Sequence, residues 1–151
     1  MQYRNLQDRH WAERICVEKP VTSSHRYDPP GAGSLRGLRI LVVEDSWHVA
    51  KAMTRLLNTL GADLAGPAAT TAEAERLISE RRPDVALVDF NLRDGELACD
   101  LIDRLKDQGI SVIVITGYEV IPLAPGKAEA ILHKPVGAAQ LVATVRQVTS
   151  N

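Results

Sequence analysis

The chain has 151 residues, of which 45% are hydrophobic and 25% are charged, and its formal net charge is -1. This composition predicts one soluble domain with a sizeable core, and the near-zero net charge gives no support for binding to nucleic acid or to a membrane surface. No apolar run reaches the roughly 18 residues that a transmembrane helix needs, and the N-terminus lacks the apolar core of a signal peptide, so we expect a cytoplasmic protein.

Residues 1–36 differ in composition from the rest of the chain. Their apolar residues are scattered without a sustained period, and a Pro-Pro-Gly-Ala-Gly stretch stands near their end, which is typical of a flexible tail and linker. A short helix in this extension stays open as an alternative, and its apolar side chains would be Leu6, Trp11 and Ile15. We therefore predict an N-terminal extension over 1–36 and a folded domain over 37–151.

From residue 38 onward, apolar runs of strand length alternate with amphipathic segments of helical period. The strand candidates are residues 38–43, 62–66, 85–89, 111–116 and 130–133. The helix candidates are residues 49–60, 71–81, 97–105 and 138–148. Thr70 and Glu73 have the spacing of a capping box at the start of the second helix, and Gly61 and Pro83 end the first and the second.

Apolar runs without polar alternation are typical of strands that are buried on both faces. Five such runs separated by helical segments predict an α/β fold, in which helices cover both faces of a parallel sheet. In such sheets the ligand site lies beyond the carboxyl ends of the strands. The polar residues at those ends are Glu44, Asp45, Asp89, Thr116 and Lys134. We therefore expect three acids, one hydroxyl and one amine to converge at one edge of the sheet.

The converging acids indicate a metal site. Carboxylates that lie close together raise one another's pKa values unless a cation neutralises them. Mg²⁺ prefers oxygen ligands and uses few protein groups, which suits Glu44, Asp45 and Asp89 with a backbone carbonyl nearby. Zinc is disfavoured, because the nearest histidines fit a helix face and a strand end better than a ligand set; they are His48 and His133.

Four short motifs, in this order and spacing, resemble the receiver domains of two-component response regulators. They are VVEDS at 42–46, LVDFNLRDG at 87–95, VITG at 114–117 and HKP at 133–135. The resemblance covers residues 38–149 and implies a doubly wound, flavodoxin-like sheet of five strands in the order 2-1-3-4-5. It also implies that the chain accepts a phosphoryl group from a histidine kinase or a phosphotransfer protein, and that it is no enzyme beyond its own phosphorylation and dephosphorylation.

The resemblance implies a role for each residue at the strand ends. Asp89 would be the phosphoacceptor, and an aspartate can attack phosphorus to give an acyl phosphate. Thr116 would be the switch hydroxyl. Lys134 would contact the phosphoryl group, placed there by a cis bond to Pro135.

The same resemblance implies the ligands of Mg²⁺. Glu44 and Asp45 would form the acidic pair around the ion, and Asp89 would bind it as well. The backbone carbonyl of Asn91, two residues past the acceptor, would complete the protein ligands.

Two features depart from the family pattern. Ile131 stands where many receivers carry an aromatic residue that turns inward on phosphorylation. Pro122 and Pro125 would each cost roughly 3 kcal/mol inside a helix, so we expect the fourth helix to be shortened or replaced by a loop. A short segment after ITGY resembles a subgroup of single-domain receivers, in which Tyr118 would take over part of the aromatic's role or be a surface tyrosine.

Other functions stay open as alternatives. A phosphohydrolase with an aspartyl nucleophile needs a second acid two residues on, and Asn91 in that position disfavours an enzyme. A pseudo-receiver that docks without being phosphorylated is favoured by Ile131 and opposed by the complete set of site residues.

The route of the signal out of the domain is also a prediction. Because the sequence ends at Asn151, we expect no output domain downstream and an output through protein contact; a downstream target and homodimerisation stay open. We expect residues 117–133 to be the bistable element and to bind the partner together with the final helix, 138–148. The competing contact site is the extension, 1–36.

Overall fold

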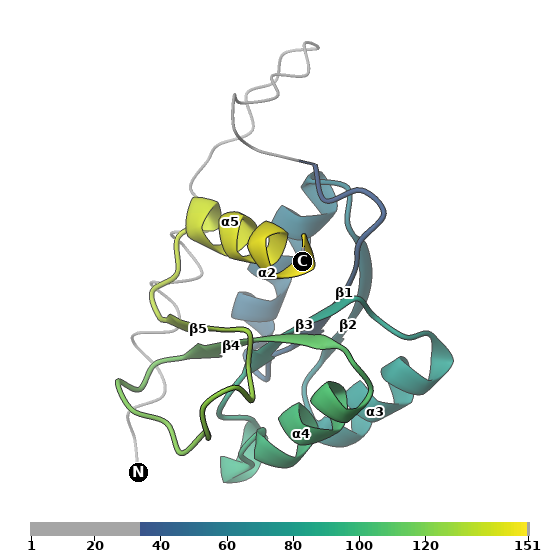
Figure 1. Cartoon of the computed structure of the whole chain (residues 1–151). Helices are drawn as coiled ribbons and strands as arrows, with labels where there is room; N and C mark the ends of the chain where they lie inside the picture. The colour runs from purple at the N-terminus through teal and green to yellow at the C-terminus, as the bar shows by residue number, and fades with distance from the viewer. Residues whose placement is uncertain (1–33, 151) are drawn as a thin grey trace.

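The expected α/β architecture is confirmed by the computed structural model, which describes residues 34–150. Five parallel strands form one sheet in the order β2-β1-β3-β4-β5 (Figure 1). The strands are β1 (Arg39–Val43), β2 (Asp63–Ala68), β3 (Val85–Asp89), β4 (Ser111–Thr116) and β5 (Ala130–His133). The helices are α2 (Trp47–Thr59), α3 (Thr71–Glu80), α4 (Cys99–Asp107) and α5 (Ala138–Thr149), and a 3-10 turn, η1, spans Arg93–Gly95.

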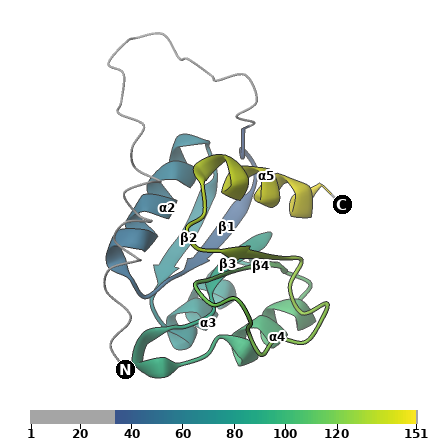
Figure 2. The same ribbon diagram turned by 90° about the vertical axis from the view of Figure 1, so that its left-hand side faces the viewer.

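The helices cover both faces of the sheet. Helices α2 and α5 lie on one face, and α3 and α4 lie on the other (Figures 1 and 2). All five residues of β3 are buried, which explains why its sequence is an uninterrupted apolar run as far as the terminal aspartate. Leu35, which the sequence analysis assigned to the extension, is fully buried in the core layer beneath α2 and α5, and its amide donates to the carbonyl of Leu60.

Helix α3 begins at the predicted capping box. The Thr70 hydroxyl accepts a hydrogen bond from the Glu73 amide at 3.2 Å. The Glu73 carboxylate in turn accepts from the amide of Ala69 at 2.7 Å. Two donors that the first helical turn would otherwise leave unpaired are thereby satisfied.

Several predicted element boundaries differ from the structure by one or two residues; helix α2, for example, begins at Trp47 and not at residue 49. Strand β2 continues to Ala68, two residues further than expected, through the cis Gly66–Pro67 bond. The next helix was expected to begin at Leu97, but α4 begins only at Cys99 and Leu97 is 46% exposed. The backbone just before α4 instead pairs with the loop after β3, through an antiparallel bridge between Leu97 and Asn91.

The described residues between β4 and β5 contain no helix, as the two prolines predicted. The later part of this segment, 121–129, is attached to the α3 and α4 side of the molecule. Its apolar side chains pack against the core there; they are Ile121, Leu123 and Ala128. Lys127 forms an ion pair with Asp103 of α4 at 2.6 Å, and Glu129 pairs with Lys106 of the same helix.

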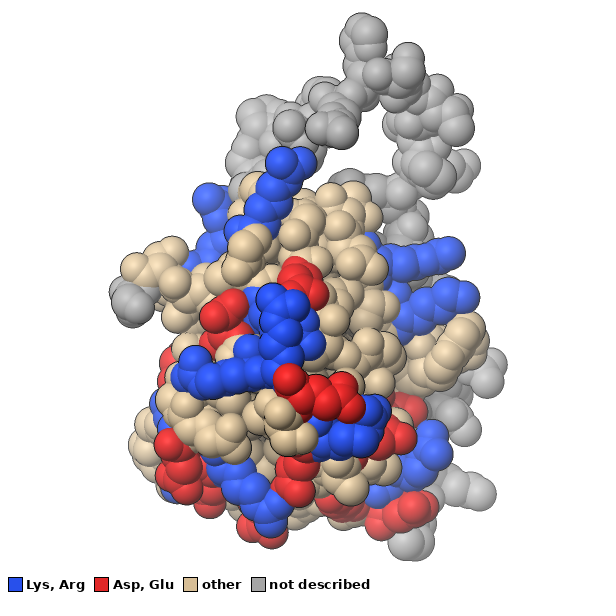
Figure 3. All heavy atoms as spheres, turned by 90° about the vertical axis from the view of Figure 1, so that its right-hand side faces the viewer, with Lys and Arg blue, Asp and Glu red and all other residues tan. Residues whose placement is uncertain are grey.

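Charges of both signs are interspersed over the face shown in Figure 3. Asp63 at the start of β2 pairs with Arg39 and with Arg81, each at 2.9 Å. On α3, Arg76 pairs with Glu80 one turn later. None of the helices in residues 34–150 combines the length and the apolar character needed to span a bilayer.

Candidate functional site

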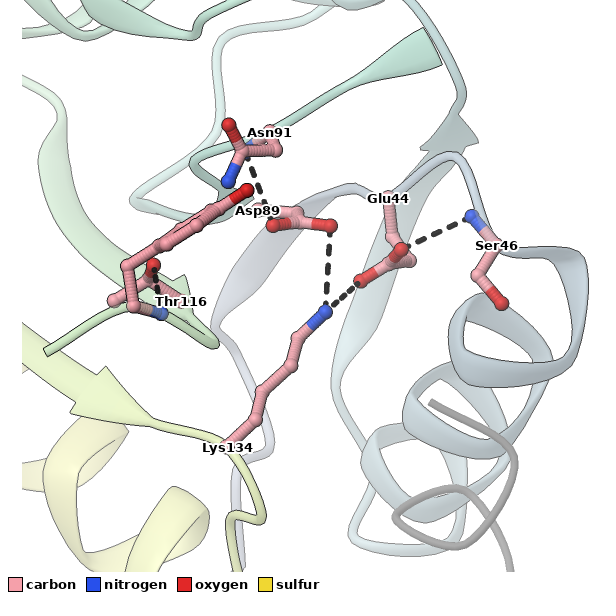
Figure 4. A network of polar contacts seen from close by, with 7 residues as sticks. Glu44, Ser46, Asp89, Asn91, Thr116 and Lys134 are labelled. Carbon is pink, nitrogen blue, oxygen red and sulfur yellow. Dashed lines mark hydrogen bonds and ion pairs between the residues drawn. The ribbon is translucent and has the colours of Figure 1, made fainter. Parts of the chain in front are cut away.

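The polar residues expected at the strand ends lie together at the carboxyl edge of the sheet. Figure 4 shows Lys134, which follows β5, extending its side chain toward Asp89 at the end of β3 and Glu44 after β1. The Lys134 Nζ lies 3.3 Å from Asp89 Oδ2 and 3.5 Å from Glu44 Oε2. One ammonium group is therefore shared by two carboxylates.

Backbone amides orient both carboxylates. The Ser46 amide donates to Glu44 Oε1 at 3.0 Å, and the Asn91 amide donates to Asp89 Oδ1 at 3.2 Å. In each case the donor stands two residues after the acid, where the chain turns away from its strand. One oxygen of each carboxylate is thus fixed by the local turn, and the other faces Lys134 (Figure 4).

Burial disfavours the ionised form of both carboxylates, and the Lys134 ammonium offsets this effect only in part. Glu44 is 2% exposed and Asp89 is 7% exposed. Burial, with the charge of Asp89 adding to it, raises the pKa of Glu44 to about 8, although Lys134 and the Ser46 amide act in the opposite direction. Burial also raises the pKa of Asp89, against the opposing effects of Lys134 and the Asn91 amide. The site therefore favours uptake of further positive charge.

The donor set fits a hard divalent cation. Glu44, Asp45 and Asp89 each offer a carboxylate oxygen, and these atoms lie within 4.8 Å of one another. Among the described residues, neither His48 nor His133 belongs to a group of this kind. Three carboxylates without nitrogen or sulfur ligands suit Mg²⁺ better than zinc. The roles of these acids and of the Asn91 carbonyl remain predictions.

Thr116 ends β4 beside this cluster and is fully buried. Its hydroxyl accepts a hydrogen bond from the Tyr118 amide at 3.1 Å. Its carbonyl accepts from the Lys134 amide at 2.8 Å, which ties the end of β4 to the start of the loop after β5. The peptide bond between Lys134 and Pro135 is cis, as the resemblance implied.

Two further residues were singled out from the sequence: Ile131, which departs from the usual receiver pattern, and Tyr118, which was expected to replace its aromatic in part or to be a surface tyrosine. Ile131 is 43% exposed and Tyr118 is 58% exposed. In the sheet register Ile131 pairs with Val114, whose side chain belongs to the core on the α3 and α4 side. With a loop in place of a helix between β4 and β5, Ile131 is only half covered on that side.

One contact at the site was not predicted from the sequence. His133 was interpreted as a strand-end residue, but its Nδ1 also lies 3.0 Å from the carbonyl oxygen of Tyr118. Fifteen residues separate the two, and the path of the loop between them decides whether they meet. The sequence around these two residues contains no pattern from which the path of this loop could be predicted.

Comparison with known proteins identifies the family. Residues 40–146 match the model of the response regulator receiver domain. The chain belongs to this family. It is 34% identical over 112 residues to the phyllosphere-induced regulator PhyR of Methylorubrum extorquens, a match that covers 72% of this chain and 42% of that protein.

Solved structures agree with this receiver fold. The response regulator PhyR from Brucella abortus has a TM-score of 0.70 at 24% identity, over 79% of this chain and 50% of that one. The receiver domain of Erythrobacter litoralis PhyR has a TM-score of 0.67 at 27% identity, over 77% of this chain and 90% of that domain. The chain spans about half the length, or less, of the curated relatives it matches.

Proposed function

We propose that this receiver domain accepts a phosphoryl group on Asp89 from a phosphohistidine of a histidine kinase or a phosphotransfer protein, and that it passes the signal on by protein contact. The observation that carries the proposal is the position of Asp89 Oδ2, 3.3 Å from the Lys134 ammonium and beside the acids Glu44 and Asp45. The buried acceptor, its cationic partner and a metal-compatible acid pair thus occupy one site.

The transfer step uses these residues as follows. A carboxylate oxygen of Asp89 forms a bond to phosphorus while the phosphorus–nitrogen bond of the donor breaks, and the donor ring leaves as neutral imidazole after it takes up a proton. Lys134 compensates negative charge on the phosphoryl oxygens. At Gly117 an added Cβ would have no atom within 4 Å, so the approach of the donor past this residue is open.

Mg²⁺ would be held by Glu44, Asp45 and Asp89, with the carbonyl of Asn91, and would supply the remaining positive charge during transfer. The raised pKa of Glu44 supports this assignment, because burial and the neighbouring Asp89 disfavour the ionised form of Glu44 despite Lys134, and a bound cation would offset both effects. Asn91 also stands where an aspartyl phosphohydrolase needs its second acid. The acyl phosphate is therefore expected to persist long enough to act as a signal.

The alternative is a pseudo-receiver that docks without being phosphorylated. Ile131, in place of an inward-turning aromatic, favours it. Intact-mass spectrometry after incubation with acetyl phosphate and Mg²⁺ separates the two functions. The proposal expects one phosphoryl adduct on the parent chain and none on Asp89→Asn.

The matched control is Asp94→Asn, which makes the same chemical change at an exposed acid five residues later. Asp94 has φ 60°, a conformation that asparagine tolerates. Full adduct formation is expected for this control. An adduct retained by Asp89→Asn would show that another residue is the phosphoacceptor. A parent chain without any adduct would support the pseudo-receiver.

A further inference from the structure

His133 joins the end of β5 to the residues that follow β4. Its Nδ1 and the carbonyl oxygen of Tyr118 are 3.0 Å apart, and because a carbonyl only accepts, the ring nitrogen is the donor. His133 is the register partner of Thr116 on the neighbouring strand. The imidazole therefore reaches across the ends of two paired strands to the second residue after β4.

The backbone of Tyr118 is consequently held on both sides. Its amide donates to the buried hydroxyl of Thr116 at 3.1 Å, and its carbonyl accepts from His133. The Lys134 amide donates to the carbonyl of Thr116, so the residues next to His133 are tied to the same strand end. Any displacement of the Thr116 hydroxyl changes the position of Tyr118 relative to His133.

The segment between β4 and β5 divides into two parts with different attachments. Residues 121–129 are attached by packing of Ile121 and Leu123 and by the ion pairs of Lys127 and Glu129 with α4. Residues 117–120, by contrast, are all exposed, and Val120 is 85% exposed. The side-chain hydrogen bonds to residues 117–120 that we find are the two to Tyr118.

We propose that His133 is a positioning residue that holds residues 117–120 in their resting place through the Tyr118 carbonyl, so that this hydrogen bond limits the response of the segment to phosphorylation. The inference rests on the proposed phosphorylation of Asp89. It narrows the predicted bistable element, residues 117–133, to its first four residues, because residues 121–129 are attached to α4.

The chemistry at Asp89 gives the direction of the effect. A phosphoryl group adds acceptor oxygens, and the Thr116 hydroxyl is a neutral donor that turns toward them. Movement of Thr116 pulls on the Tyr118 amide, while His133 retains the Tyr118 carbonyl at β5. Loss of the His133 hydrogen bond therefore lowers the cost of the rearrangement.

Three variants test this role. His133→Leu removes the donor and keeps a side chain of similar bulk. His133→Asn places an amide nitrogen about as far from the backbone as Nδ1 and is expected to restore the hydrogen bond. His48→Leu makes the same substitution at an exposed histidine on α2, which has no contact with Tyr118 in any hydrogen bond that we find.

The first measurement is amide hydrogen exchange by NMR in the unphosphorylated protein. Exchange at the Tyr118 amide is expected to rise about two- to tenfold in His133→Leu, as for loss of one ordinary hydrogen bond. Exchange of residues 121–129 is expected to stay unchanged, and His133→Asn and His48→Leu are expected to resemble the parent. Unchanged exchange in His133→Leu, or equal behaviour of the Leu and Asn variants, would overturn the proposal.

The second measurement follows the NMR signals of residues 117–120 after phosphorylation with acetyl phosphate and Mg²⁺. In unphosphorylated His133→Leu these signals are expected to lie part of the way toward their phosphorylated positions, and in His133→Asn at the parent positions. Signals of the Leu variant that stay at the parent positions would reject His133 as a restraint. If the parent takes up no phosphoryl group, the proposed function fails, while the exchange experiment still decides whether His133 holds Tyr118.

Discussion

Lys134 and Asp89 form an ion pair between strands that are not neighbours in the sheet, with Nζ 3.3 Å from Oδ2. The lysine follows β5, the aspartate ends β3, and β4 lies between them. Lys134 also lies 3.5 Å from Glu44, so its ammonium compensates two buried carboxylates at once. A phosphoryl group on Asp89 would present oxygens to the same ammonium, and the resting ion pair thus places the lysine where the modified site needs it.

Replacement of this lysine is the first prediction. Lys134→Ala is expected to slow phosphoryl uptake from acetyl phosphate on the order of 100-fold, because the transition state loses a cation aimed at developing negative charge. Quench-flow or intact-mass time courses measure the rate. Lys127→Ala, at a lysine in an exposed pair with Asp103, is the matched control and is expected to keep the parent rate. Equal rates in the two variants would show that Lys134 takes no part in phosphoryl transfer.

Proton release on metal binding is the second prediction. The pKa of Glu44 is raised to about 8, mainly by burial, so at pH 7 the metal-free site holds a proton for most of the time. Mg²⁺ binds the carboxylate form. Binding at pH 7 is therefore expected to release up to about one proton per chain, and the affinity is expected to rise as the pH increases toward 8. Calorimetry in buffers of different ionisation enthalpy measures the number of protons.

The same pKa shift predicts how stability depends on pH. In the folded chain Glu44 titrates near 8, and its ordinary value is 4.5. Between these values the folded state binds more protons than the unfolded state, so the free energy of unfolding without metal falls as the pH rises through this window. Glu44→Gln is expected to flatten that slope and to abolish most of the proton release. A parent chain with no slope and no released proton would show that Glu44 is already ionised.

A further prediction concerns Asp45, the half-buried member of the acid cluster. Asp45→Ala removes one of three carboxylates and is expected to weaken Mg²⁺ binding roughly tenfold or more, since affinity for such ions follows the charge of the ligands. Titration calorimetry measures the affinity. Asp107→Ala, at an exposed acid at the end of α4, is the control and is expected to bind Mg²⁺ as the parent does. A normal affinity in Asp45→Ala would exclude Asp45 from the ligands.

The meeting of Asp89 and Lys134 could be predicted from the sequence, because parallel strands all end at the same edge of a sheet. The start of α4 could not, since the apolar period runs through Leu97 while the backbone there bonds to Asn91. The contact of His133 with Tyr118 was also beyond reach. It depends on the course of the loop after β4, which side-chain packing and ion pairs determine together.

The attachment of residues 121–129 to α4 could not be predicted from the sequence either. The two prolines predicted the missing helix correctly. The pairing of Lys127 with Asp103, however, joins residues from segments whose relative placement only the folded chain defines. Residues 117–133 were expected to be bistable because two prolines and Gly126 limit regular hydrogen bonding there; the structure adds that residues 121–129 contact the core and α4.

The last prediction is that Gly66, in the edge strand β2, affects both the stability of the sheet and the metal site. This residue of β2 has φ +98°, and an added Cβ would lie 2.8 Å from the carbonyl oxygen of Val42 in β1. Gly66→Ala is therefore expected to lower the free energy of unfolding by about 1–3 kcal/mol from backbone strain, and further because β2 must move away from β1. The Ala68 carbonyl, two residues later, accepts from the Glu44 amide at 2.9 Å, so movement of β2 displaces Glu44 and is expected to weaken Mg²⁺ binding as well.

The control is Gly126→Ala. Gly126 has a similar φ of +80°, but no atom lies within 4 Å of the added Cβ, so this variant tests the backbone strain alone. Urea unfolding and Mg²⁺ titration of both variants test the link, and equal losses of stability with unchanged affinities would show that β2 does not position Glu44.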